Sequence, residues 1–467
     1  MKRLLLLFVV LLSPAFALTA EWQSLDVNGD GQPEHLAITN LADVAFNDEG
    51  QIVGWYVKQI KGQNFKGNYA KAPNLVKEGL PLPGTLVGFT AKTARLEEGS
   101  PGLANHFTPE QNRFYEESGS LIAEFAAPGA RLRYRIDPRL YTLELELELE
   151  EPTELIWSGI NRSERPVTKL LPAGSDEPLP AGSGRAAYVA LQTKNNKGYA
   201  FVVKGDGPLD ARLEPVQGGA VATIELPAGT TRVEVYGGLN ELVRLYVEGF
   251  YELPGLFKPN IWGQLSLGLL YVMELAYKYT GNWGLAILLL TVFVRLLLWP
   301  LMHQQFKSMA EMNKLKPLMD EINKKFKDDP EKKNEAIMNL YREHKINPAA
   351  GCLPLFIQMP ILFMMWRVIA NYEFDQGFLW IPDLSLPDPF YVLPALYVLV
   401  MLAQTLLMSH GNKDAMRQGI MMNLIFIFLV LKFPAGVTLY WVFSTLIGLV
   451  QQWMINKQLG IQPAAGS

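Results

Sequence analysis

The chain has 467 residues, a formal net charge of −4 and 49% hydrophobic residues. A mildly acidic chain lacks the basic surface of a general nucleic-acid binder, and its single cysteine excludes an internal disulfide and a cysteine-cluster metal site. The length allows two or three domains. Charged and turn-forming residues fill the first half, and long apolar segments fill the second.

The N-terminus reads as an export signal. Residues 1–20 begin with Lys2 and Arg3, continue with an apolar run and end in small residues that suit cleavage by a signal peptidase. The alternative is an uncleaved anchor, although its apolar stretch is shorter than the ~20 residues that a helix needs to cross a bilayer. In both cases we expect the residues that follow to be exported.

Residues 21–250 carry the pattern of an all-β domain. Arginines alternate with apolar residues in Arg131–Ile136, and glutamates alternate with leucines in Leu143–Leu149, so that two half-buried strands are predicted. Paired as a hairpin, these strands set an arginine row against a glutamate row. Other short strands between Gly/Pro-rich turns indicate a large antiparallel sandwich. We expect them at Ile52–Lys58, Ala187–Thr193, Tyr199–Lys204, Ala220–Leu226 and Thr231–Gly237.

A loop near the start of this domain has a calcium-type pattern. Asp26, Asn28 and Asp30 place oxygen ligands at positions 1, 3 and 5, a turn-making glycine follows, and Glu34 offers a fourth ligand at position 9. A full EF-hand loop needs a glutamate at position 12, where this chain has an alanine. A short calcium loop and a plain polar turn both fit the pattern.

From about residue 251 the chain becomes apolar. An apolar segment within 251–281 is interrupted by Gln264, Glu274 and Lys278, which is typical of a helix that lies in the membrane interface. Five further apolar segments predict membrane spans. They cover residues 285–302, 352–370, 390–408, 419–431 and 433–455.

The charges of the loops orient these spans. Residues 303–350 hold ten lysines and arginines, whereas 371–388 hold none and carry four acidic residues. Because basic loops stay in the cytoplasm, we expect the first loop and the short tail, 458–467, inside and the second loop outside. Asp329 before Pro330 predicts the start of a second helix, so residues 303–350 are expected to form a helical hairpin.

One arginine lies inside the first of these spans. A guanidinium at the depth of Arg295 costs roughly 2.5–3.5 kcal/mol, so we expect it to face a partner or a hydrated cavity. Polar residues of the other spans fall at a similar depth. Singly, such residues serve as interhelical hydrogen bonds, but together they indicate a wet groove in the inner half of the membrane. The predicted groove residues are Arg295, Thr291, Gln358, Gln404, Tyr440, Trp441, Ser444 and Thr445.

Such a groove suits the movement of peptide into a bilayer. A polar stretch of a passenger would find water and a positive charge partway across, while its apolar stretch slides against lipid. Burial of the passenger's apolar helix, at ~0.8 kcal/mol per CH₂, would supply the driving force. The sequence has no phosphate-binding loop, so we expect neither a nucleotide nor another cofactor.

Two other functional classes, an enzyme and a transporter or channel, fit the sequence less well than peptide insertion. The five histidines are dispersed, without a Ser/His or HExxH arrangement, so we do not expect an enzyme. A polytopic transporter or channel is the alternative function, although no inverted repeat of hydropathy is visible.

Long ordered motifs make the chain resemble the YidC/Oxa/Alb family of membrane-protein insertases. They are Asn282–Leu301, LYREHKINPAAGCLPLFIQMPILF at Leu340–Phe363, and FPAGVTLYWVFSTLIGLVQQWMI at Phe433–Ile455. The resemblance implies a five-span α-helical core over residues 282–457. It also implies an exported all-β supersandwich domain over 21–250, as in insertases of the inner membrane of diderm bacteria.

The resemblance further implies partners and roles. Nascent membrane proteins would enter a groove that is open to cytoplasm and lipid but closed externally, either alone or beside the Sec translocon. Arg295 would receive the acidic exported part of the passenger, and Thr291 and Tyr440 would contact its helix. Gln404 and Trp441 would line the groove. The cytoplasmic hairpin would capture substrates, whereas the short tail carries too few basic residues for strong ribosome binding.

Overall fold

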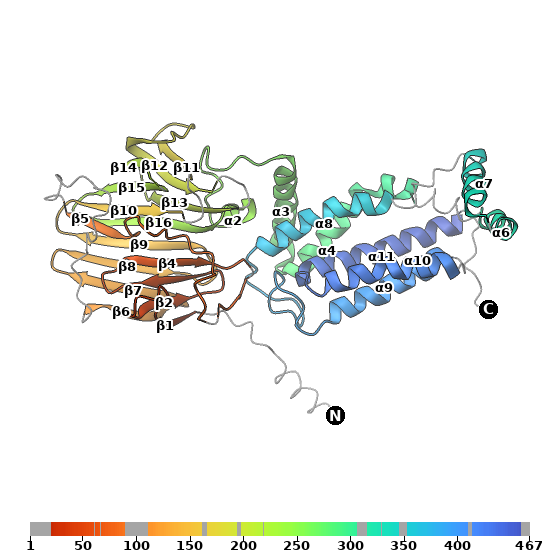
Figure 1. Ribbon diagram of the computed structural model, residues 1–467, viewed down its shortest axis with the longest axis horizontal. Coiled ribbons are helices and arrows are strands. Elements are labelled where there is room, and N and C mark those ends of the chain that lie inside the picture. Colours follow the sequence, from red (N-terminus) through yellow and green to blue (C-terminus); the bar gives the residue numbers. More distant parts are fainter. Residues whose placement is uncertain are drawn as a thin grey trace, which may run out of the picture. The chain divides into compact units, whose positions relative to one another are not determined.

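The structure is a computed structural model. It describes residues 20–458 except for 60, 66, 89–110, 161–165, 194–197, 218, 306–314, 328, 345–352 and 410–412. The described chain divides into two compact units, one ending at Pro259 and the other beginning at Asn260. The first unit is built mainly of strands and the second of helices (Figure 1). The expected export signal and almost all of the expected tail lie outside the described residues.

The first unit opens with a four-stranded antiparallel sheet. The strands follow one another in space as they do in the sequence: β1 (Glu21–Leu25), β2 (Glu34–Ile38), β3 (Ala42–Phe46) and β4 (Ile52–Val57). The loop with the calcium-type pattern joins β1 to β2. Its glycines adopt the left-handed backbone that such a tight turn needs, with φ of 81° at Gly29 and 88° at Gly31.

A 12-stranded antiparallel sheet forms most of the remainder. Its main path runs β5 (Thr85–Gly88), β10 (Thr153–Gly159), β15 (Gly219–Leu226), β14 (Leu209–Val216), β12 (Gly182–Gln192), β13 (Tyr199–Gly205), β16 (Gly229–Leu239), β9 (Thr142–Leu149), β8 (Ala130–Ile136), β7 (Ser120–Ala127) and β6 (Arg113–Glu117). The strand β11 (Val167–Pro172) pairs with β12, and a short helix, α2 (Leu242–Val247), follows β16. The strand regions expected from the sequence are confirmed, with small shifts of their ends.

The two sheets share one hydrophobic core, which makes the unit sandwich-like. Aromatic side chains of the small sheet contact those of the large one: Phe46 and Tyr134 have ring centroids 4.9 Å apart. Trp55 and Phe201 meet edge to face at 5.3 Å. Edge-to-face and tilted packing of this kind adds about 0.5–1.5 kcal/mol per pair beyond the burial of apolar area.

The predicted arginine–glutamate hairpin is confirmed as β8 and β9. The register sets each arginine of β8 directly opposite a glutamate of β9. The pairs are Arg131–Glu148, Arg133–Glu146 and Arg135–Glu144. The alternating leucines of β9 are buried, so this hairpin carries charge on its outer face and core residues on its inner face. The charged rows therefore have an ordinary structural explanation.

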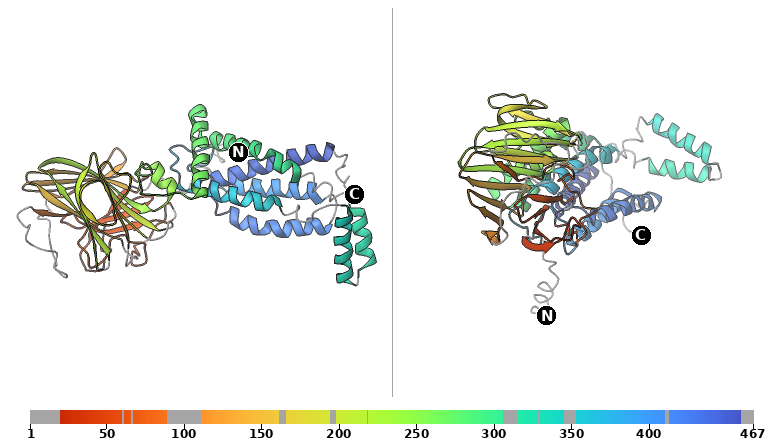
Figure 2. Two further views of the ribbon diagram at one scale, coloured as in Figure 1. Left: turned by 90° about the horizontal axis from the view of Figure 1, so that it is seen from above. Right: turned by 60° about the vertical axis from the view of Figure 1, so that its left-hand side comes forward.

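The second unit is a helical bundle centred on α11 (Ala435–Gln458). This helix packs against α4 (Trp283–Leu297), α8 (Leu353–Asn371) and α9 (Val392–Ser409), and α10 (Lys413–Val430) packs against α9. The helix α3 (Ile261–Thr280) contacts α4 and α8 and lies across the direction of the others (Figures 1 and 2).

The start of α3 differs from the expected segment 251–281. The helix begins at Ile261, where the Asn260 side chain caps it by accepting a hydrogen bond from the Gly263 amide at 2.9 Å. The residues just before it belong to the strand unit, because the Tyr188 hydroxyl donates to the Pro254 carbonyl at 2.8 Å. The helix ends at Gly281, which has a left-handed backbone.

The first expected span, 285–302, is bent rather than continuous. The helix α4 ends at Leu297, and a second helical segment, Trp299–Gln305, continues at an angle of 64°. Pro300 explains the break, because it has no amide hydrogen for the helix ladder and is tolerated only in a first turn. In the described part of the chain this bent pair alone has the length and hydropathy of a membrane span, and no single helix does.

Two helices of the basic loop lie side by side: α6 (Lys316–Lys325) and α7 (Pro330–Glu343) (Figure 2). The predicted cap of α7 is confirmed, because Asp329 accepts a hydrogen bond from the Lys332 amide at 3.1 Å and Pro330 occupies the first turn. Leu315, Leu340 and Tyr341 form a small core between the two helices.

Candidate functional site

The centre of the candidate site is Arg295 in the last turn of α4. Its Nε donates a hydrogen bond to the Ser444 hydroxyl of α11 at 2.8 Å. Gly448, one turn further along α11, lies beside the guanidinium, whose nitrogens would be in ordinary van der Waals contact, at 3.6 Å, with a Cβ at that position. No carboxylate pairs with Arg295 in the described part of the chain. A partly buried cation is therefore held by a neutral hydroxyl alone.

Two more of the predicted groove residues join this centre. The Gln358 amide of α8 donates a hydrogen bond to the Tyr440 hydroxyl of α11 at 3.3 Å. Tyr440 is almost fully buried and lies close enough to Arg295 for an electrostatic interaction. We name these residues the Arg295 cluster; it consists of Arg295, Gln358, Tyr440, Ser444 and Gly448.

The remaining predicted residues lie around the cluster in different ways. Thr291 and Thr445 are buried, and their hydroxyls bond to carbonyls of their own helices, those of Ile287 and Trp441. Gln404 is partly exposed on α9. Trp441 packs in an aromatic group rather than beside the arginine. Its ring contacts are Tyr397, Phe426 and Phe433.

Sequence reasoning missed a second group of buried polar residues, toward the C-terminal ends of α4 and α11. The Gln451 amide donates to the Trp299 carbonyl at 3.5 Å, which joins α11 to the bend after α4. Within the described chain, the side-chain oxygens of Gln451 and Gln452 and both polar atoms of Gln305 have no hydrogen-bond partner. Buried amides without partners are costly. Three glutamines beside otherwise apolar segments were the signal available in the sequence.

The opposite end of the bundle is packed with aromatic residues. The rings of Trp283 and Tyr277 stack with their centroids 3.7 Å apart. The indole nitrogen of Trp283 donates a hydrogen bond at 2.5 Å to Asp375, which lies in the loop between α8 and α9. Phe378 of the same loop lies directly on Gly284, where a Cβ would approach its ring to 2.1 Å. This loop therefore lies tightly against the start of α4 and leaves no space for larger side chains.

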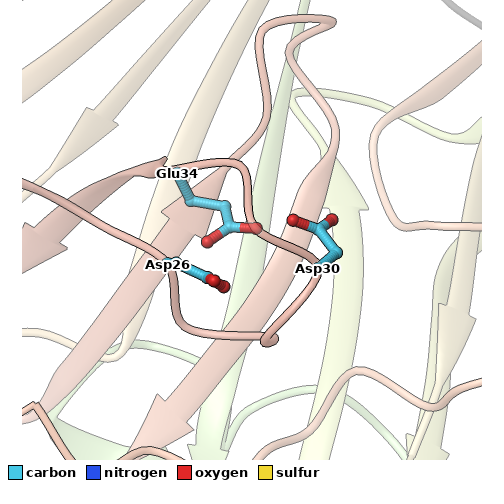
Figure 3. A group of neighbouring side chains, drawn as sticks. All are labelled: Asp26, Asp30 and Glu34. Carbon is cyan, nitrogen blue, oxygen red and sulfur yellow. The ribbon is translucent and has the colours of Figure 1, made fainter.

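The predicted metal ligands lie in the other unit. Asp26, Asp30 and Glu34 each offer a carboxylate oxygen, and these atoms lie within 4.8 Å of one another (Figure 3). The fourth predicted ligand, Asn28, bonds with its side chain to Asp30 at 2.9 Å. The structure thus brings together the four residues that the spacing singled out.

The Arg295 cluster brings together side chains that donate and accept hydrogen bonds. Its members are a guanidinium, a carboxamide, a phenol and a hydroxyl, and none of them is paired with a general base in the described chain. A guanidinium held by neutral groups attracts carboxylates and peptide carbonyls.

Comparison with known proteins identifies the family of the chain. Residues 275–462 match the family model described as 60Kd inner membrane protein. The membrane protein insertase YidC of Deinococcus radiodurans is 39% identical over 346 residues, which are 71% of this chain and 80% of that protein. The YidC of Geobacter sp. strain M21 is 35% identical over 253 residues, 53% of this chain and 47% of the relative.

A solved structure gives the same fold. A crystal structure of an active YidC insertase, with its first transmembrane domain resolved, aligns with 96% of this chain and 98% of that one. The TM-score is 0.58 and the sequence identity is 24%. The order of a β-sandwich-like domain and a helical core is therefore common to both proteins.

A sandwich-like domain followed by a helical core is the architecture of that solved membrane-protein insertase. The chain belongs to the YidC family of membrane protein insertases, whose members are inner membrane proteins. Its function is the insertion of membrane proteins, with nascent membrane proteins as substrates and the lipid bilayer as the second partner. The relatives are named for insertion and not for a catalysed reaction.

Proposed function

We propose that this chain inserts membrane proteins through a hydrated groove in the inner half of the membrane, with the Arg295 cluster at its centre. The observation that carries the proposal is the bond from Arg295 to Ser444 with no carboxylate beside it in the described chain. A guanidinium without a counter-ion is stable within a bilayer only where water or a polar substrate reaches it.

The helical unit is proposed to cross the membrane five times. The spans are the bent pair formed by α4 and the segment after it, followed by α8, α9, α10 and α11. The helix α10 begins at Lys413, before the apolar segment 419–431, which supports its length as a span. The helix α3 lies across the others and is proposed to rest in the outer interface. The sandwich-like domain is then periplasmic, and α6 and α7 are cytoplasmic.

The groove is proposed to open inward and to be closed outward. Support for closure is the dense packing of Trp283 and Phe378 at the start of α4. Support for an open inner end comes from the unpartnered side-chain oxygens of Gln451 and Gln452 and from both polar atoms of Gln305, which need water or peptide as hydrogen-bond partners. A passenger would therefore enter from the cytoplasm and leave sideways into lipid.

The steps of insertion follow from this geometry. A polar stretch of the passenger enters the groove, where Arg295 attracts its acidic side chains and Gln358 and Tyr440 offer hydrogen bonds. Its apolar helix meanwhile contacts lipid, and each buried CH₂ contributes ~0.8 kcal/mol. About ten such groups outweigh the ~2.5–3.5 kcal/mol that one buried charge costs. Hydrolysis of a nucleotide is therefore not needed.

Partners beyond the substrate and lipid belong to the same proposal. The small core between α6 and α7 leaves their outer faces free for the capture of nascent chains at the cytoplasmic surface. Cooperation with the Sec translocon is proposed for longer clients, and weak contact with the translating ribosome is proposed through the short tail. No observation favours the alternative of a transporter or channel.

Site-specific crosslinking tests the groove directly. A photoreactive residue is placed singly at Thr291, Gln404 and Tyr440 in full-length protein that meets a ribosome-stalled membrane protein. We expect crosslinks to the nascent chain from these three positions. The matched control is Leu289, an exposed residue on another face of α4. Crosslinks from the control alone would contradict the proposed groove.

A further inference from the structure

The insertase function leaves the loop between β1 and β2 unexplained. This loop lies in the sandwich-like unit, and its acidic residues contribute nothing to the helical core. We propose that residues 26–34 form a calcium-binding site in which Asp26, Asn28, Asp30 and Glu34 supply the side-chain ligands.

The first observation is the convergence of the ligand atoms. One carboxylate oxygen from each of Asp26, Asp30 and Glu34 lies within 4.8 Å of the other two (Figure 3). Oxygens bound to one calcium ion at 2.3–2.6 Å lie at most about 5 Å apart. The three carboxylates are thus already spaced as ligands of a single ion, although they repel one another when no cation is present.

The second observation is the burial of Glu34. Only 4% of this residue is exposed, and one of its carboxylate oxygens accepts a hydrogen bond from the Val27 amide at 2.8 Å. The other oxygen has no described partner, and neither Lys nor Arg pairs with any of the three carboxylates. Burial, together with the charges of Asp30 and Asp26, raises the pKa of Glu34 above its ordinary value. A divalent cation would supply the missing positive charge.

A residue outside the loop gives independent support. Tyr56 of β4 is 3% exposed, and its hydroxyl makes no hydrogen bond in the described chain. It lines a hollow of about 960 Å³ together with Asn28, Asp30 and Glu34. Burial and the charge of Glu34 raise the pKa of Tyr56 to about 12, so the hydroxyl keeps its proton. A water molecule on the bound ion would give the Tyr56 hydroxyl a hydrogen-bond partner.

The hydrogen bonds of the loop are compatible with binding. Asp26 accepts bonds from the amides of Gly29 and Gly31 at 2.6 and 3.0 Å, which fixes the turn around the ion position. Each carboxylate oxygen keeps a second lone pair for a metal. Such an arrangement holds the ligands in place before the ion arrives.

The ligand set favours calcium over magnesium. All ligands are oxygens, they come from one surface turn, and water would complete the coordination, which suits the 6–8 ligands of calcium. Magnesium demands near-ideal octahedral geometry with shorter bonds. The class of calcium sites in extracellular modules binds with Kd of roughly 10⁻⁴–10⁻³ M, and we expect an affinity in this range. Binding would fasten the β1–β2 turn at the edge of the hollow.

The test is calcium titration of the full-length protein in detergent micelles, by calorimetry and by thermal unfolding. We expect one calcium per chain and a higher Tm with calcium, and no binding of magnesium at equal concentration. Asp30→Asn should weaken calcium binding at least tenfold. Glu78→Gln removes an acidic side chain from another part of the same hollow and should bind as the wild type does.

Three results would overturn the proposal: no calcium bound by the wild type, magnesium bound equally well, or equal calcium affinity in Asp30→Asn. If Asp30→Asn does not fold, Asn28→Ala, which removes a neutral ligand, takes its place and should also weaken binding. Membrane insertion by these variants is expected to be unchanged without calcium, so that a failure of this proposal is separate from the insertase function.

Discussion

Two cationic side chains, one in each unit, are withdrawn from solvent in opposite ways. In the sandwich-like unit, Lys58 and Asp43 pair at 2.8 Å with side chains only 2% exposed. Lys58 also donates to the Thr39 carbonyl, and Asp43 accepts a bond from the Tyr69 hydroxyl at 3.0 Å. In the helical unit, Arg295 donates to the Ser444 hydroxyl and pairs with no carboxylate of the described chain. The charge of Lys58 has its partners within the fold, and we propose that the charge of Arg295 is available to a substrate.

Substitution of Lys58, which pairs with Asp43, should have the largest effect, a loss in the free energy of unfolding. Lys58→Met leaves Asp43 buried without its cation, and breaking such a pair costs about 3–5 kcal/mol. Urea unfolding of the full chain, followed by tryptophan fluorescence, measures the free energy of unfolding. As control, Arg131→Ala removes half of an exposed pair and should cost about 1 kcal/mol or less. A loss for Lys58→Met as small as that of the control would refute the structural role.

Removal of the arginine should act on insertion instead. Arg295→Ala is expected to lower insertion of short clients with acidic exported tails about tenfold, a loss of ~1.4 kcal/mol in transition-state stabilisation. Stability should change by less than about 1 kcal/mol, because only one hydrogen bond to a neutral group is lost. Arg295→Lys keeps the charge and should retain more activity.

The control for this change is Arg367→Ala, which removes an arginine on α8 outside the cluster. Insertion assays in liposomes, at matched protein levels, compare the three variants. Equal insertion of acidic-tailed clients by Arg295→Ala and Arg295→Lys would contradict a role for the positive charge of Arg295.

Substitution of Ser444, the hydrogen-bond partner of Arg295, should lower insertion less than substitution of Arg295 itself. Ser444→Ala removes the acceptor of the Arg295 bond, but in a hydrated groove water replaces the hydroxyl. We expect insertion to fall no more than about threefold. A dry site would instead lose a hydrogen bond to a charge, worth about 1.5–3 kcal/mol. A drop of more than tenfold would therefore indicate that the cluster is sealed from water.

The smallest expected effect concerns the buried carboxyl group of Glu34. Its pKa is raised in the folded, calcium-free protein above the ordinary value of 4.5, mainly by burial. Protonation of Glu34 therefore stabilises the folded state. This stabilisation is complete below pH 4.5 and is lost as the pH rises through the pKa of Glu34 in the folded protein. Without calcium, the free energy of unfolding of the wild type should fall relative to that of Glu34→Gln as the pH rises through this folded pKa. A parallel pH dependence of the two proteins would contradict the prediction.

The sequence predicted well what depends on neighbours along the chain. The alternation in Arg131–Ile136 set the face and pairing of β8, and Asp329 before Pro330 set the start of α7. The spacing of Asp26, Asp30 and Glu34 placed three carboxylates in one turn. Each of these features is decided within a few residues, where periodicity and capping dominate.

Contacts between helices were harder to predict. Helical spacing places Tyr440 and Trp441 on adjacent faces of α11, but it does not say which neighbour each face meets. The structure pairs Tyr440 with Gln358 and surrounds Trp441 with aromatic rings. The bend after Leu297 was also missed, although Pro300 was a visible cause. Hydropathy averages over such a break, so the polar residues near it, such as Gln451, received no weight.

Solvent accessibility of the Arg295 cluster distinguishes a hydrated groove from a dry contact between helices. Cys352 is the only cysteine of the chain, so Cys352→Ser gives a background for single cysteines at Ser444 and at Leu289, which is exposed on another face of α4. Each is treated in oriented membranes with a charged maleimide added to the cytoplasmic side. We predict rapid labelling at position 444 and none at position 289. An unlabelled cysteine at position 444, in a protein that still inserts its clients, would contradict a hydrated groove around Arg295.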